Sequence, residues 1–180
     1  MMQNIEQPAV AAIVRTAHGS SDAVLVDFAR YLRENGWRVC GLVQDSTARD
    51  PSCARQMALI DLDDGSRFTI SQNLGPGSSS CCVDPGGVAA ASVALRRGLT
   101  EGADLVIANR FGELEAAGGG LAAEMLAVMA GGIPLLTSVS ERYLDNWRRF
   151  SGNSAKELPP RREALETWFD GILQQGKAPR

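Results

Sequence analysis

The sequence predicts an α/β domain in which helices cover both faces of a mostly parallel sheet, giving three layers. Two observations lead to this prediction. Short, nearly continuous apolar runs alternate along the chain with segments of helical periodicity. The length of 180 residues is that of one ordinary domain, and we find no internal repeat or interdomain linker. We therefore expect a single domain over residues 1–180.

The first unit is a strand, a short loop and a helix. The apolar run from Ala9 to Arg15 suits a strand that is covered on both faces. After a loop at 16–21, apolar residues at four-residue spacing predict a helix that stops at Asn35-Gly36. A second strand is predicted from Trp37 to Gln44.

A β-hairpin is predicted next. The runs Gln56 to Leu62 and Arg67 to Ser71 flank the turn sequence Asp63-Asp64-Gly65-Ser66, so we expect a hairpin inserted before the next helix. The Gly- and Ser-rich segment 72–82 is predicted to be a loop. Asp84-Pro85 has the N-cap and first-turn proline of a helix, which we expect to continue to Leu99.

The rest of the chain continues the alternation. The predicted elements are a strand at 105–108, a loop at 109–120, a helix at 121–130, a strand at 133–139, and helices at 141–150 and 161–175. The core of the sheet then lies within about 9–140, and 141–180 adds C-terminal helices. Ligands of open α/β sheets bind beyond the carboxyl ends of the strands, where the loops at 16–21, 72–84 and 109–120 are expected to meet.

The loop at 16–21 stands where a phosphate-binding P-loop, G-x-x-x-x-G-K-[ST], would lie. Aligning Gly19-Ser20-Ser21 with G-K-[ST] puts serine in the place of the lysine and Val14 in the place of the first glycine. The loss of the lysine argues against fast phosphoryl transfer, and we lean against an enzyme. Backbone N–H groups at the N-terminus of a helix can still hold an anion.

Three side chains of this loop are candidates for binding that anion. His18 could donate a hydrogen bond or act as an acid or base, and a structural role for its imidazole is an equal alternative. Ser20 and Ser21 offer hydroxyl groups, and Ser21 holds the position that would contact magnesium in a P-loop. The alternative for both serines is simple capping of the helix.

The segment 104–115 has the form of a Walker B strand and the turn after it. Asn109 stands where the metal-binding acid is expected, so it cannot neutralise the charge of magnesium. Arg110 could bind an oxyanion through bidentate contacts. It could instead pair with Glu113 or Glu115.

Two further loops could contribute donors. Gly118-Gly119-Gly120 could form a nest of N–H groups, or simply supply positive φ angles. Ser78, Ser79 and Ser80 could form a hydroxyl-rich lid over the site. No metal site is predicted; if magnesium is bound after all, Asp84, Glu113 and Glu115 are the candidate ligands, although capping of a helix explains Asp84 well.

Composition excludes several classes of protein. The net charge of −3 gives no general attraction to nucleic acid or to an anionic membrane. Met1 to Gln7 lacks the features of a secretory signal, and no apolar run is long enough to cross a bilayer. We expect a cytoplasmic protein whose four cysteines, none of them in a CxxC pair, are reduced thiols.

Four segments carry a resemblance to a known family: Gly41-Leu42-Val43-Gln44, Cys82-Val83-Asp84-Pro85, Asn109 to Glu115, and Gly118-Gly119-Gly120-Leu121. They resemble DUF2478, a family of uncharacterised bacterial proteins linked to molybdenum ABC transport. Over roughly 9–140, the order of elements also resembles the THEP1-like group of P-loop nucleoside triphosphatases, with a degenerate Walker A loop. The resemblance implies a P-loop NTPase fold and the handling of molybdate or tungstate. No catalytic residue carries over.

Three functional hypotheses follow. The first is a noncatalytic oxyanion-binding or accessory protein for molybdate or tungstate, with ABC-transporter or molybdenum-pathway proteins as partners and a homo-oligomer as a further option. Its expected ligand-binding residues are His18, Gly19, Ser20, Ser21, Ser78, Ser79, Ser80, Asn109 and Arg110. The second is a slow NTPase or nucleotide-binding protein with a magnesium nucleotide. The third is a regulatory or scaffold protein with a vestigial site, whose aromatic residues Trp147, Phe150, Trp168 and Phe169 form either a partner surface or part of the core.

Overall fold

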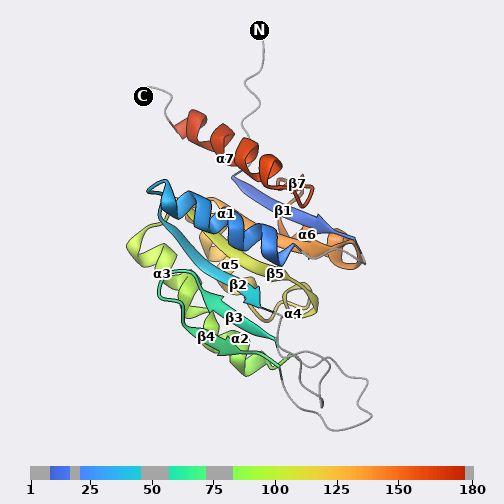
Figure 1. Ribbon diagram of the computed structural model, residues 1–180. Helices are drawn as coiled ribbons and strands as arrows, with labels where there is room; N and C mark the ends of the chain where they lie inside the picture. Colours follow the sequence, from blue (N-terminus) through green and yellow to red (C-terminus); the bar gives the residue numbers. More distant parts are fainter. Residues whose placement is uncertain (1–8, 17–20, 46–56, 72–82, 177–180) are drawn as a thin grey trace.

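A seven-stranded sheet forms the centre of the protein (Figure 1). The computed structural model describes residues 9–16, 21–45, 57–71 and 83–176. Within these residues the strand order is β4-β3-β2-β5-β6-β1-β7. The strands are β1 (Val10–Arg15), β2 (Val39–Asp45), β3 (Ala58–Asp61), β4 (Arg67–Thr69), β5 (Leu105–Phe111), β6 (Leu135–Ser140) and β7 (Lys156–Leu158).

The helices lie between these strands in the chain. They are α1 (Asp22–Glu34), α2 (Pro85–Ala91), α3 (Val93–Glu101), α4 (Glu113–Ala116), α5 (Ala122–Ala130), the 3-10 helix η1 (Glu141–Tyr143), α6 (Leu144–Phe150) and α7 (Arg162–Gly176). The pairs β2·β5, β5·β6, β6·β1 and β1·β7 are parallel, whereas β2·β3 and β3·β4 are antiparallel. The predicted fold class is therefore confirmed, including the inserted hairpin.

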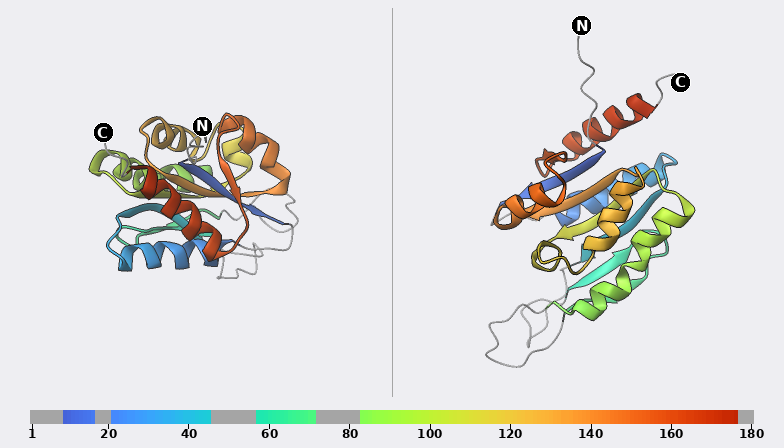
Figure 2. Two further views of the ribbon diagram at one scale, coloured as in Figure 1. Left: turned by 90° about the horizontal axis from the view of Figure 1, so that it is seen from above. Right: turned by 180° about the vertical axis from the view of Figure 1, so that it is seen from behind.

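Alternate side chains of the central strands pack into two apolar layers, as expected when helices cover both faces of a sheet. Ala11 and Ile13 of β1 pack in the layer that contains α1 and α7. Ala12 packs in the opposite layer, with α2, α3, α5 and α6. Figure 2, seen from above, shows α1 and α7 on one face of the sheet and α3, α5 and α6 on the other.

The C-terminal aromatic residues belong to these two layers. Trp147, Trp168 and Phe169 are at most 1% exposed, and Phe150 is partly buried. Phe150 and Trp147 pack on Phe111, with ring centroids 5.1 and 5.3 Å from that of Phe111. Trp147, Trp168 and Phe169 therefore form part of the core and not a partner surface, because a side chain inside the core cannot meet a partner.

The structure differs from the predicted elements in several places. The helix predicted to continue to Leu99 is two helices that meet at Ser92, whose hydroxyl donates to the carbonyl of Ala89 (2.7 Å). Strand β5 runs to Phe111, three residues beyond its predicted end. The connection predicted at 151–160 contains β7, which pairs with β1 at Ala11–Ile13. Among the described residues, no helix is long and apolar enough to span a membrane.

Candidate functional site

The carboxyl ends of β1 and β5 lie on the same side of the molecule as the first turn of α1 (Figure 1). Arg15 is the last residue of β1, and Asn109 and Arg110 lie near the end of β5. Ser21 and Asp22 begin α1. These five residues are brought together because parallel strands end at a common edge and α1 starts there, which is the edge where ligands of such sheets bind.

Asn109 joins three elements at this edge. Its side chain is fully buried, its Nδ2 donates to Oδ1 of Asp22 (2.9 Å), and its Oδ1 accepts from the hydroxyl of Ser138 on β6 (2.7 Å). These bonds fix the orientation of the amide, with the donor towards the carboxylate. Asn109 thus positions α1 against β5, and its carbonyl oxygen is already occupied within the protein.

Two arginine side chains share this edge with a single described carboxylate. Nη2 of Arg110 lies 3.5 Å from Oδ2 of Asp22. The pKa of Arg15 is lowered from its usual value, first by burial and then by the positive charge of Arg110; the carboxylate of Asp22 opposes this shift. Arg15 and Arg110 therefore bring two positive charges close together in a partly buried place, with Asp22 as a counter-charge.

Three polar atoms of the described site residues are buried and have no hydrogen-bond partner among the described parts of the chain. They are Nε of Arg15, Nε of Arg110 and Oγ of Ser21. Ser21 is the N-cap of α1, but its side chain makes no capping hydrogen bond. Ser21 therefore holds the N-cap position without the side-chain hydrogen bond of a capping serine. An unpaired buried donor costs on the order of 1–3 kcal/mol, so a ligand that accepts from these groups would be stabilised here.

The carboxylates near the site have structural partners. Glu115 is 7% exposed, and its two oxygens accept the backbone N–H groups of Gly112 and Leu121, each at 3.0 Å. Oδ1 of Asp84 accepts from the N–H of Gly86 (2.9 Å), which is the predicted cap. In the described residues, no three His, Cys, Asp or Glu side chains gather as a metal site would need.

The segment 109–120 is not a simple loop. It contains the end of β5 and the helix α4, and the hydrogen bonds of Glu115 close the turn from Gly112 to Leu121. The ion pair of Arg110 is with Asp22. The alternative that Arg110 pairs with Glu113 or Glu115 is therefore not what the structure shows.

Several predicted site residues cannot be placed. His18, Gly19 and Ser20 of the first loop, and Ser78, Ser79 and Ser80 of the predicted lid, lie outside the described residues. In contrast, Arg15, Asp22 and Ser138 belong to the site, although the sequence analysis did not propose them. The position of Arg15 and Asp22 on either side of the loop at 16–21 was the available signal, because a charged residue at each end of a ligand-binding loop faces the same edge.

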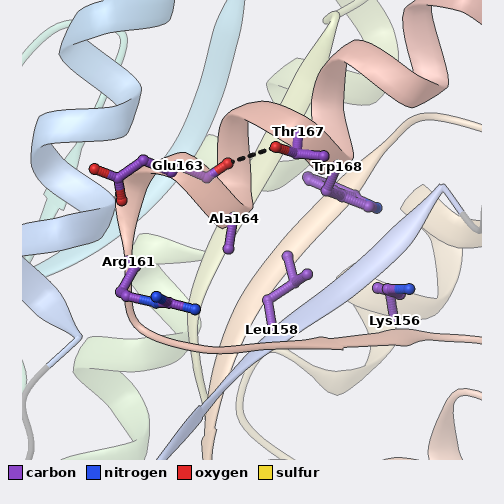
Figure 3. A pocket seen from close by; sticks show the side chains of 7 residues that line it. All are labelled: Lys156, Leu158, Arg161, Glu163, Ala164, Thr167 and Trp168. Carbon is purple, nitrogen blue, oxygen red and sulfur yellow. Dashed lines mark hydrogen bonds between the residues drawn. The ribbon is translucent and has the colours of Figure 1, made fainter.

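A separate hollow of ≈ 400 Å³ lies between β7 and α7 (Figure 3). Lys156 and Arg161 face it together with Glu163, so its charges are mixed. The hydroxyl of Thr167 donates to the backbone oxygen of Glu163 (2.8 Å). None of the predicted site residues lines this hollow, and none of the unpaired buried atoms belongs to it.

The mostly parallel sheet, with its site at the strand ends beside the start of a helix, defines an α/β protein of the P-loop NTPase type. A solved structure with this fold is that of a human cancer-related nucleoside triphosphatase, with a TM-score of 0.59. The alignment covers 95% of this chain and all of that chain, at 15% sequence identity, and so shows the fold alone.

A family model described as a protein of unknown function, DUF2478, matches residues 10–168, so the chain belongs to the DUF2478 family. A curated relative, the molybdenum import ATP-binding protein ModC 2 of Bradyrhizobium diazoefficiens, is 37% identical over 165 residues. The match covers 92% of this chain but 18% of the relative, so the chain spans less than a fifth of that protein's length.

Proposed function

We propose that the protein is a noncatalytic oxyanion-binding accessory protein that handles molybdate or tungstate. The observation that carries this proposal is the set of three unpaired buried polar atoms, on Arg15, Arg110 and Ser21, around the start of α1. All three groups can donate a hydrogen bond, and two of them carry a positive charge. An oxyanion accepts hydrogen bonds and carries negative charge, so it suits the three donors and the two positive charges.

The start of α1 and the two guanidinium groups all favour the binding of an anion. The first turn of α1 presents backbone N–H groups and the positive end of the helix dipole. Guanidinium groups bind tetrahedral oxyanions through parallel N–H donors, and such charge-assisted hydrogen bonds are about twice as strong as neutral ones. Arg15 and Arg110 would therefore supply the charge that a P-loop lysine usually supplies, which supports the proposal even though Ser20 stands in the lysine's place.

The choice of molybdate and tungstate rests on the relative's name, which links that protein to molybdenum import. In this proposal the protein works in the cytoplasm as a single domain, beside a molybdenum ABC transporter or other molybdenum-pathway proteins. Its charge of −3 is compatible with that role because the anion site is local.

Isothermal titration calorimetry with molybdate, tungstate, sulfate and phosphate tests the proposal. We expect molybdate or tungstate to bind, and Arg110→Gln and Arg15→Gln each to weaken binding by about tenfold or more, because each removes a charged donor. Arg96→Gln is the matched control, since Arg96 is exposed on α3 and outside the site. Absence of binding for all four anions would overturn the proposal.

A slow magnesium-dependent NTPase is the second candidate, and the fold shared with a nucleoside triphosphatase favours it. Turnover of ATP and GTP with Mg²⁺ tests it directly. Glu113→Gln is the informative variant, because Glu113 is exposed and the change leaves the hydrogen bonds of Glu115 intact. Absence of turnover by the parent protein excludes this function, and turnover that depends on Glu113 would establish it.

A further inference from the structure

A large cavity adjoins the proposed oxyanion site. Its volume is ≈ 1000 Å³, and Asn109 and Arg110 form part of its wall. The cavity lies between the hairpin β3–β4, α2, the turn around α4, and η1, and its wall also includes Gln44 of β2 and Val83 before α2. A tetrahedral oxyanion with five heavy atoms fills only a small part of such a space, which is at the upper end of the range for cofactor-sized ligands.

Most of the wall is apolar. The apolar lining comes mainly from Met57, Leu59, Ile70, Val88, Leu114 and Leu121. Leu59, Ile70, Val88 and Leu121 are themselves core residues, at most 4% exposed, so this wall is held in place by the packing beneath it. A rigid apolar wall favours an apolar ligand body, because an apolar body loses its own contact with water there and a polar body would lose its hydrogen bonds to water.

The polar lining carries two cations. Arg110 projects from β5, with its Nε buried and unpaired among the described residues. Arg142 lies on η1 with its guanidinium 5.4 Å from the centre of the Tyr143 ring, and the described residues provide no carboxylate that pairs with it. Glu115 also lines the cavity, but both of its oxygens accept backbone N–H groups. Glu113 and Arg142 are both exposed, so solvent screens both charges, whereas Arg110 is partly buried.

We propose that this cavity binds an organic phosphate, whose phosphate group lies at Arg110 and Arg142 and whose apolar body lies on the wall formed by β3, α2 and the α4 turn. This inference rests on the proposed function, because it uses the oxyanion site at Arg110. It extends that function from inorganic anions to a larger substrate class. The two arginines select the phosphate, and the apolar wall selects the body attached to it.

The probe for the test is 1-naphthyl phosphate, with inorganic phosphate, 1-naphthol and molybdate as comparison ligands, all measured by calorimetry on the full chain. We expect 1-naphthyl phosphate to bind at least about tenfold more tightly than either phosphate or 1-naphthol, because each comparison ligand lacks one half of the recognised structure. Molybdate reports on the inorganic oxyanion site separately.

Variants at Ala117 and Arg142 test where 1-naphthyl phosphate binds. Ala117 lines the cavity and is exposed, so Ala117→Trp should block the space and abolish binding of 1-naphthyl phosphate without disturbing the core. Ala127→Trp, at an exposed position of α5 away from this cavity, is the matched control and should bind normally. Arg142→Gln should weaken 1-naphthyl phosphate by about tenfold and leave molybdate binding unchanged.

The outcomes separate the two proposals. Equal affinity for 1-naphthyl phosphate and phosphate, or for 1-naphthyl phosphate and 1-naphthol, overturns the organic-phosphate inference. If molybdate binds in that same experiment, the proposed function stands without it. If 1-naphthyl phosphate binds tightly and is blocked by Ala117→Trp, while no inorganic anion binds, the cavity inference is supported and the molybdate function fails.

Discussion

Replacing Glu115 should lower the free energy of unfolding much more than replacing an exposed glutamate. The carboxylate is 7% exposed, and each of its oxygens accepts one backbone N–H, from Gly112 and from Leu121, at 3.0 Å. A hydrogen bond to a charged group contributes about 1.5–3 kcal/mol. In Glu115→Gln the amide keeps one acceptor and turns an NH₂ group towards the other N–H, so we expect the free energy of unfolding to fall by about 2 kcal/mol.

Glu115→Ala removes both acceptor oxygens, so the N–H groups of Gly112 and Leu121 lose their hydrogen bonds to this side chain. The free energy of unfolding should then fall by about 4 kcal/mol, roughly twice the loss in Glu115→Gln. Both values can be measured by urea denaturation, in which a change of midpoint at constant m-value reports stability alone.

Glu113→Gln is the matched control, because Glu113 lies on the same short helix but is exposed. Its change in unfolding free energy should stay within about 0.5 kcal/mol. If Glu115→Gln unfolds at the same urea concentration as Glu113→Gln, the hydrogen bonds of Glu115 do not hold the turn, and our description of this edge of the site is wrong.

Three further changes have expected outcomes. Gly41→Ala should destabilise the protein by more than about 3 kcal/mol in a thermal melt, because φ is +114° and the added Cβ would lie 2.0 Å from the backbone oxygen of Ile107. Arg97→Met should cost about 3 kcal/mol in urea, because the carboxylate of Asp61, 3.0 Å from Arg97 and 1% exposed, would lose its cation. Arg15→Gln should leave stability without added anion unchanged or slightly higher, because burial and Arg110 disfavour the charge of Arg15, and should reduce the rise in Tm on addition of molybdate.

The controls for these changes use neighbouring or equivalent positions. Gly36→Ala also meets a positive φ of +84°, but a Cβ there has open space, so it should cost only about 1 kcal/mol. Arg96→Met removes an exposed arginine next to Arg97 and should be nearly neutral. Equal effects at Gly41 and Gly36, or at Arg97 and Arg96, would contradict the packing described here. A Tm that rises with molybdate as much in Arg15→Gln as in the parent protein would remove Arg15 from the site.

The fold could be predicted because its signals are local in the sequence. The apolar runs of β1, β5 and β6, and the Asp-Gly turn of the hairpin, specify strands without reference to distant residues. Strand β7 could not be found this way, because three residues are too few to show alternation and its pairing with β1 depends on tertiary contact. The end of β5 was missed for a similar reason. The polar residues Asn109 and Arg110 indicate a loop when the sequence is taken alone. In the folded protein they can belong to a strand because Asp22 and Ser138 bind their polar groups.

The sequence predicted where a candidate site would lie, but it named only some of the residues that the structure brings together there. The rule that ligands bind at the carboxyl edge of the sheet predicted this region, and that remains a prediction. The P-loop alignment named Ser21, and the donor chemistry of arginine named Arg110; both have buried unpaired atoms at this edge. Arg15 was assigned to the strand alone, since sequence spacing does not reveal that its charge lies close to that of Arg110. The two arginines are close because β1 and β5 lie on either side of β6. The strand order of the sheet is needed to know this.

The most direct test of the central claim is a crystal structure of the protein soaked with tungstate, whose heavy atom is located by its anomalous signal. The account predicts a tungsten peak at the start of α1, with the tungstate oxygens within hydrogen-bond distance of Nε of Arg15, Nε of Arg110 and Oγ of Ser21. A tungstate bound only elsewhere, or side chains of the protein's own loops filling that position, would contradict it.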